Sequence, residues 1–262
     1  MNKIIKATAE ACFRTLGYYP ARINGLKFKV DPYHVGYWRS VERKDWEPYT
    51  YGILSKLLKP DSVYFDVGAW IGPTVIYAAK LCQHVVCFEP DPIAYRYLRW
   101  NIELNQLSNV QSFNLALSNK TSIQRIASFG DSLGDSMTSL LNDRIDGNKA
   151  ENAADVLAFN WRDFNKLLLL ERMDFLKVDI EGGEFDLLPS IKDYLSSQKP
   201  IVYLSVHAPF LDENIRKERM QQLIDVMGIY KKCFSENMEQ VSIQELISDD
   251  TLNAFRAFIF ID

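Results

Sequence analysis

The strongest constraint on the fold is a regular alternation of apolar and amphipathic segments that begins after Pro60. An apolar strand is predicted at 62–68 and leads through a glycine turn into a helix. A second strand at 84–90 precedes a helix at 93–105, and a third strand follows at 110–117. Strands joined through helices in this way are parallel and carry helices on both faces of the sheet. The sequence therefore predicts an α/β fold with a doubly wound, mostly parallel sheet.

The alternation resumes in the second half of the chain, with strands predicted at 173–180 and 201–208, a helix at 184–196 and a last strand at 255–261. Between the halves, the stretch 118–160 is polar and contains glycines. Long irregular connections of this kind often cover functional sites. We therefore expect a hairpin and a loop there that can close over a site.

The length of 262 residues fits one α/β domain with an accessory segment. We predict a substrate-covering N-terminal cap over 1–55, which is rich in aromatic residues, and the α/β domain over 56–262. The net charge of −4 argues against a nucleic-acid partner, whose many phosphates would need neutralising. Four cysteines without a CxxC pair suit a reducing cytoplasm. No apolar stretch reaches the roughly 20 residues of a membrane span, so no integral membrane segment is expected, and the oligomeric state stays open.

Ligands of a doubly wound sheet lie beyond the carboxyl ends of its strands. Ionisable side chains follow four of the five predicted strands at that edge: Asp66, Glu89, Asp179 with Glu181, and His207. Neighbouring carboxylates repel one another, so a purely structural sheet gains nothing by gathering them. His207 is the only histidine at such an end, and a histidine of near-neutral pKa is the usual general base.

The first of these loops, "FDVGAWIGPT" (65–74), indicates which cofactor the site holds. A dinucleotide site has the pattern G-x-G-x-x-G, which brings backbone amides to a pyrophosphate. Here the glycines are Gly68 and Gly72, and Asp66 precedes them. A carboxylate is unfavourable beside a pyrophosphate and favourable beside a sulfonium. Glu89 ends the second strand, where a carboxylate accepts hydrogen bonds from a ribose diol. NAD sites share this acidic residue, so Glu89 alone does not identify the cofactor. Together with the loop it favours S-adenosylmethionine.

The segments "VYFDVGAWIGPT", "VVCFEPDP", "RWNIELNQLSNVQSFNLALS" and "MDFLKVDIEGGEFDLL" resemble successive blocks of the FkbM family of S-adenosylmethionine-dependent methyltransferases. The resemblance covers roughly residues 45–207, and "KVDIEGGE" is its most specific part. It implies a Rossmann-like class I methyltransferase fold with a final antiparallel strand. It also implies O-methylation of a hydroxyl on a sugar, a glycan or a natural product.

The resemblance also implies roles for single residues. The cofactor residues would be Asp66, Gly68, Ala69 and Gly72 in the loop, Glu89 at the ribose, Leu117 and Ser118 beside the adenine, and Glu47 near the methionine end. The catalytic residues would be Asp179, Glu181 and His207. Trp70 departs from the family, which usually has Asn at this position.

Three alternatives remain open from the sequence. Asp179 and Glu181 are hard oxygen ligands that could hold Mg²⁺, but no metal is predicted. The glycine loop could instead belong to an NAD-dependent oxidoreductase with an irregular fingerprint. A non-catalytic, methyltransferase-like binding module is the third reading. The expected partner is a small-molecule or glycan substrate.

Overall fold

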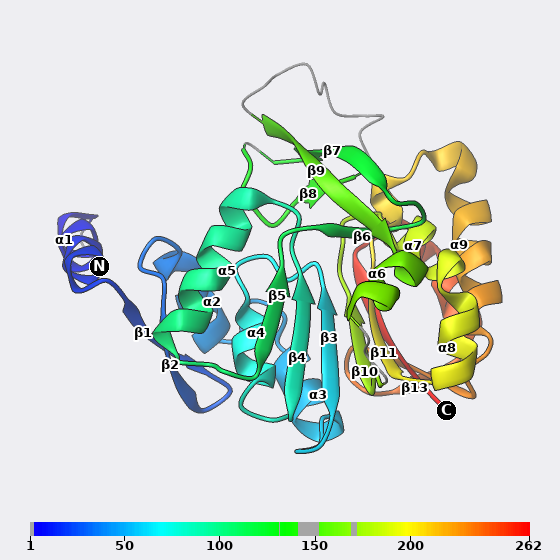
Figure 1. The fold of residues 1–262 in the computed structure, drawn as a ribbon, viewed down its shortest axis with the longest axis horizontal. Helices are drawn as coiled ribbons and strands as arrows, with labels where there is room; N and C mark the ends of the chain where they lie inside the picture. The colour runs from blue at the N-terminus through cyan, green and yellow to red at the C-terminus, as the bar shows by residue number, and fades with distance from the viewer. Residues whose placement is uncertain (1–2, 131, 141–151, 169–171) are drawn as a thin grey trace.

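The computed structural model describes residues 3–130, 132–140, 152–168 and 172–262. Its main sheet has eight strands (Figure 1). They lie in the order β13 (Gln240–Val241), β12 (Lys232–Ser235), β14 (Arg256–Ile261), β11 (Ile201–Val206), β10 (Phe175–Val178), β3 (Val63–Val67), β4 (His84–Phe88) and β5 (Val110–Phe113).

The five strands from β11 to β5 are parallel, as their alternation with helices predicted. The last strand of the chain, β14, pairs antiparallel with β11, so the expected final antiparallel strand is confirmed. The sequence prediction missed β12 and β13, which are short and extend the sheet beyond β14. The order of the seven strands from β12 to β5, with β14 reversed between β12 and β11, is that of a Rossmann-like class I methyltransferase fold, and β13 adds a second reversed strand at the edge.

Helices cover both faces of the sheet and enclose two separate cores. One face carries α2 (Val35–Glu42), α3 (Thr50–Leu57), α4 (Pro73–Ala78) and α5 (Pro92–Leu104). The other carries α6 (Trp161–Leu168), α7 (Glu184–Ser190), α8 (Lys192–Gln198) and α9 (Glu213–Met227). Successive strand residues alternate between the cores, because side chains of a strand point to opposite faces. Thus Tyr64 packs with the first group of helices and Phe65 with the second.

The N-terminal part of the chain packs on the face of α4 and α5. It consists of α1 (Lys3–Leu16), a hairpin of β1 (Tyr19–Ile23) and β2 (Leu26–Val30), and α2. Asn24 and Gly25 make the two-residue turn, both with positive φ, as hairpins of this length require. Asn101 of α5 accepts a hydrogen bond from the Asp31 amide and donates to the Ile71 carbonyl, which ties this part to the glycine loop.

A second, four-stranded sheet lies over the carboxyl ends of the central strands (Figure 1). It contains β6 (Ala116–Ser118), β9 (Ala153–Asn160), β7 (Ser122–Ser128) and β8 (Thr138–Ser139). The predicted strand at 110–117 was therefore wrong as a single element. It breaks after Phe113, where the Asn114 side chain donates to the carbonyls of Glu89 and Pro90, and β6 then pairs with β9. Residues 132–140, which include β8, are called the strap below.

Two further boundaries differ from the prediction. The helix expected at 184–196 is divided into α7 and α8 at Ile191, and Pro189, inside α7, lacks the backbone donor that would bond to the carbonyl one turn earlier. The strand expected to reach residue 180 ends at Val178, and the left-handed residues Glu181 and Gly182 turn the chain soon afterwards. Short helical turns complete the chain: η2 (Ala208–Phe210), η3 (Ile243–Ile247) and α10 (Asp249–Asn253). Among the described helices, none is long and apolar enough to cross a bilayer.

Candidate functional site

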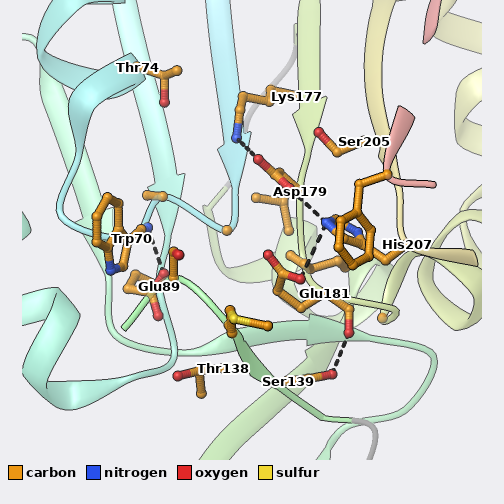
Figure 2. A pocket seen from close by; sticks show the side chains of 18 of the residues that line it. Trp70, Thr74, Glu89, Thr138, Ser139, Lys177, Asp179, Glu181, Ser205 and His207 are labelled. Carbon is orange, nitrogen blue, oxygen red and sulfur yellow. Dashed lines mark hydrogen bonds and ion pairs between the residues drawn. The ribbon is translucent and has the colours of Figure 1, made fainter. Parts of the chain in front are cut away.

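A cavity of about 460 Å³ lies at the carboxyl ends of β3, β4, β10 and β11 (Figure 2). Its volume is typical of pockets for small ligands and cofactors. Eight of the eleven predicted site residues line it: Glu47, Gly68, Ala69, Glu89, Leu117, Asp179, Glu181 and His207. The structure thus brings together side chains that are spread over 160 residues of sequence. The other three, Asp66, Gly72 and Ser118, are not among the lining residues.

Asp66 lies beneath the cavity and is fully buried. Its Oδ2 accepts hydrogen bonds from Thr74 Oγ1 at 2.5 Å and from the Tyr64 hydroxyl at 2.9 Å. Its Oδ1 is 3.4 Å from Lys177 Nζ. Thr74 and Lys177 line the cavity and separate Asp66 from it, and the predicted contact of Asp66 with the cofactor stays a prediction.

Gly72 and Ser118 have structural surroundings that explain their absence from the cavity wall. Gly72 precedes α4 with φ +86°, and a Cβ there would lie 2.4 Å from Leu98 Cδ1. It is therefore a packing glycine between the loop and α5. Ser118 is buried in the second sheet, where its hydroxyl accepts a hydrogen bond from Gln124.

Gly68 is required where the loops after β3 and β10 meet. Its φ is +87°, and a Cβ would lie only 1.7 Å from the carbonyl oxygen of Asp179. The amides of Gly68 and Ala69 both donate to the Phe88 carbonyl, each at 3.0 Å. The amide of Trp70 donates to Glu89 Oε2 at 2.7 Å. These donors are satisfied within the protein, whereas a pyrophosphate site needs them free, so the loop does not have the geometry of a dinucleotide cradle.

Glu89 is held in place by backbone donors at the end of β4. Oε2 accepts from the Trp70 amide, and Oε1 accepts from the Asp91 amide at 2.8 Å. Only 6% of Glu89 is exposed, and burial raises the pKa of its carboxyl to about 8. Each carboxylate oxygen has a second lone pair, so the ionised side chain can accept two further hydrogen bonds from the cavity.

The strap crosses the cavity and contributes six of its lining residues, from Asp135 to Leu140. At the Glu89 end, the Gly134 amide donates to Asp91 Oδ2 at 2.6 Å, and Trp70 Nε1 donates to the Gly134 carbonyl at 3.0 Å. At the other end, Ser139 Oγ donates to the Glu181 carbonyl at 2.6 Å (Figure 2). The indole of Trp70 therefore joins the glycine loop to the strap, while its amide binds Glu89.

The far end of the cavity holds a cluster of Asp179, Glu181 and His207. His207 Nε2 lies 3.4 Å from Asp179 Oδ1 and 3.4 Å from Glu181 Oε2. Its Nδ1 is 3.2 Å from Oε1 of Glu184, which is fully buried. Lys177 Nζ lies 3.1 Å from Asp179 Oδ2. The expectation that Asp179 and Glu181 face the same space is met, although Glu181 lies in a left-handed turn rather than on an extended segment.

The protonation of this cluster differs from the sequence-based expectation. Burial alone would lower the pKa of His207, but Glu184, Glu181 and Asp179 outweigh it and raise the pKa to about 9. The imidazole is therefore charged at neutral pH, unlike the neutral base that was expected. Burial raises the pKa of Glu181 to about 8. Burial would also raise the pKa of Asp179, but Lys177 and His207 lower it.

Aromatic side chains surround the open part of the cavity. Trp46 and Tyr49 of the N-terminal segment are 44% and 51% exposed. Phe255, which is 56% exposed, and Phe210 pack beside His207, with the Phe210 ring stacked on the imidazole at 5.8 Å between centroids. Flat apolar faces next to carboxylates suit a ligand that has both apolar and hydroxyl surface.

Three residues of the site were missed from the sequence: Thr74, Lys177 and Glu184. A signal existed for Lys177, because it is the only charged residue in the strand "FLKV", which is otherwise apolar. A buried lysine needs carboxylate partners, and Asp66 and Asp179 provide them. Glu184 gave no such signal, because an acidic residue in the first turn of a helix is ordinary.

A family model described as "Methyltransferase FkbM domain" matches residues 66–233 of the chain. Over 99 residues the chain is 36% identical to the tRNA (guanine(37)-N(1))-methyltransferase of Leishmania major, covering 38% of this chain and 14% of that protein. It is 24% identical over 149 residues to Methyltransferase 1 of Beauveria bassiana strain ARSEF 2860, covering 51% and 59%. The chain thus spans only about a seventh of the length of the first relative.

Among solved structures, the chain is similar to methyltransferase FkbM from Methylobacillus flagellatus KT. The sequence identity is 16% and the TM-score is 0.49, with 98% of this chain and 59% of the other covered.

Proposed function

The chain belongs to the FkbM family of S-adenosylmethionine-dependent methyltransferases, and from this premise we propose that it methylates a hydroxyl group of a sugar, a glycan or a small natural product. One observation carries the proposal. A single cavity connects Glu89, which can accept a ribose diol, with the polar cluster of Asp179, Glu181 and His207. A methyl donor bound at the first end would present its sulfonium toward the second.

The assignment of the cofactor follows the chemistry of the lining residues. When the cofactor is bound, Glu89 would accept its ribose hydroxyls and Leu117 would pack against its adenine. Gly68 and Glu47 would lie along its methionine part, where carboxylates favour cationic groups. The satisfied amides of the glycine loop support a cofactor without phosphates over NAD.

The reaction proposed is an in-line displacement. The acceptor oxygen forms a bond to the methyl carbon while the bond between that carbon and sulfur breaks. Sulfur keeps the electron pair and leaves as S-adenosylhomocysteine, and the hydroxyl proton passes to a carboxylate of the cluster. The protein contributes mainly by aligning oxygen, carbon and sulfur under the strap. Since His207 is charged when the cavity is empty, we assign it to holding the carboxylates rather than to accepting the proton.

The acceptor class is proposed from the open part of the cavity. Trp46, Tyr49 and Phe255 offer exposed aromatic faces on which the apolar face of a sugar ring can stack. The similarity to tRNA methyltransferases raises a guanine base as a second candidate acceptor. The net charge of −4 and the carboxylates of the site favour the uncharged sugar over a polyphosphate chain.

The described cysteines are all free, and we propose a reducing, cytoplasmic location.

The test offers the protein a methyl donor with a radioactive methyl group and three acceptor pools. These are mono- and oligosaccharides, hydroxylated natural products, and unmodified tRNA. We expect label in a carbohydrate or natural-product hydroxyl. Label in tRNA alone would refute the proposal. Binding of S-adenosylhomocysteine without transfer to any pool would favour a binding module, and fluorescence from bound NADH would favour the oxidoreductase.

A further inference from the structure

We propose that Asp179, Glu181 and His207 form a binding site for a divalent metal ion of the Mn²⁺ type. The sequence predicted no metal here, and the proposal stands on the geometry of the three side chains. Binding of the ion does not depend on the proposed function. Its role, which is to hold the acceptor oxygen, does rest on that function.

The spacing of the three ligand atoms fits one octahedral ion. One ligand atom from each residue lies within 4.8 Å of the others, and His207 Nε2 is 3.4 Å from an oxygen of each carboxylate. An ion with bonds of about 2.2 Å places adjacent octahedral ligands about 3 Å apart. The two separations from His207 Nε2 are within about 0.4 Å of this value. The two carboxylate oxygens lie within 4.8 Å of each other, so their side chains must rotate and approach by up to about 1.8 Å to complete one face of the coordination sphere.

The orientation of the His207 ring is fixed by Glu184, which is not one of the three proposed ligands. Glu184, on α7, accepts the His207 backbone amide at 2.8 Å and lies 3.2 Å from Nδ1. Its other oxygen accepts the Gly182 amide at 2.9 Å. The carboxylate therefore holds Nδ1 and turns Nε2 toward Asp179 and Glu181, and Figure 2 shows His207 facing these two side chains. Binding of the ion would displace the proton that Nε2 carries in the empty site, so that the imidazole binds as a neutral ligand. Metal-binding histidines almost always have such a carboxylate or carbonyl partner on the second nitrogen.

The surroundings favour a hard or borderline ion with open positions. Two carboxylates and one imidazole suit Mn²⁺ or Fe²⁺, whereas no cysteine is among the lining residues to favour a thiolate site. All three ligands line the cavity, so the remaining positions face the space where the acceptor would lie. Phe210 and Phe255 pack against the imidazole and limit access of water from that side.

The experiment measures metal binding without an acceptor. The full chain is treated with EDTA, dialysed and titrated with Mn²⁺, and the free ion is followed by electron paramagnetic resonance. We expect one Mn²⁺ per chain. Glu181→Gln removes a ligand and should weaken binding more than tenfold. Glu184→Gln removes the partner of Nδ1 and should weaken it by roughly 10- to 100-fold. Glu103→Gln, a matched change on the exposed side of α5, should leave it unchanged.

Circular dichroism and the affinity for S-adenosylhomocysteine identify folded samples of each variant. Folded wild-type protein that does not retain Mn²⁺ would overturn the proposal, and so would equal Mn²⁺ affinity in the wild type and folded Glu181→Gln. Binding of Mn²⁺ by a protein that methylates no hydroxyl would leave the metal site standing and refute the proposed function instead.

Discussion

Replacement of Glu89 by Gln tests the cofactor assignment most directly. The substitution keeps the size of the side chain but removes its charge and one of its two acceptor atoms. In the wild type, one oxygen accepts the Trp70 amide and the other accepts the Asp91 amide. A Gln side chain must turn its NH₂ group toward one of these donors. It therefore loses a backbone hydrogen bond as well as the charge that the ribose hydroxyls would meet.

The magnitude follows from the hydrogen bonds at stake. Hydrogen bonds to a charged group contribute about 1.5–3 kcal/mol each, and those between neutral groups about 1 kcal/mol. Replacing two hydrogen bonds to a charged carboxylate by two neutral hydrogen bonds costs about 2–3 kcal/mol of binding free energy. This corresponds to a factor of roughly 30 to 150 in affinity. We expect this loss for S-adenosylhomocysteine, which keeps the ribose and does not react.

The pH dependence gives an independent check. With the pKa of Glu89 raised to about 8 by burial, the empty site is mostly protonated at pH 6. Hydroxyl donors prefer the ionised form, so ligand binding lowers this pKa and releases a proton. The wild-type affinity should rise with pH up to about 8 and then level off. The ratio of wild-type to Glu89→Gln affinity should therefore increase between pH 6 and pH 8.

Isothermal titration calorimetry at pH 6, 7 and 8 measures both effects, with Glu103→Gln as the matched control. The reasoning is refuted by a Glu89→Gln affinity within threefold of the wild type at pH 8. A ratio that stays constant between pH 6 and pH 8 would refute the assigned protonation.

The other predictions concern stability and the strap. Gly68→Ala should cost more than about 4 kcal/mol in a urea titration, because its Cβ would meet the Asp179 carbonyl. Gly17→Ala, with a similar φ and nothing within 4 Å, should cost only about 1–2 kcal/mol, and equal losses would contradict the steric argument. Lys177→Met should cost about 3–5 kcal/mol, measured in the same way, because it removes the buried cation that lies between the carboxylates of Asp66 and Asp179. Trp70→Phe should speed hydrogen exchange in the strap, and unchanged rates would mean that the indole bond does not hold it.

The sequence predicted the central strands and their parallel direction, because these strands alternate with helices along the chain. Eight of the eleven residues that it singled out line the cavity, because ligands of such sheets lie beyond the strand ends. Both inferences depend on local pattern and on one rule of topology. The positions of Glu89, Asp179 and His207 in the cavity follow from them.

The structure differs from the prediction where contacts distant in sequence determine the outcome. Asp66 is absent from the cavity wall because Thr74 and Lys177 hold its side chain beneath the cavity. The protonation of His207 depends on three carboxylates, one of them on a helix whose contact with the histidine no spacing rule reveals. The break after Phe113 requires a partner strand some 40 residues away.

The strap has a consequence for how the two ends of the cavity communicate. It is bonded to Asp91 and Trp70 beside the proposed cofactor position and to the Glu181 carbonyl beside the proposed acceptor position. A ligand that strengthens the hydrogen bonds at one end of the strap also orders the strap. A second ligand at the other end then loses less conformational entropy of the strap when it binds. By thermodynamic linkage the effect is mutual and of equal size in both directions. We therefore expect the methyl donor and the acceptor substrate to bind cooperatively. After the reaction, bound S-adenosylhomocysteine should slow the release of the methylated acceptor until the strap opens.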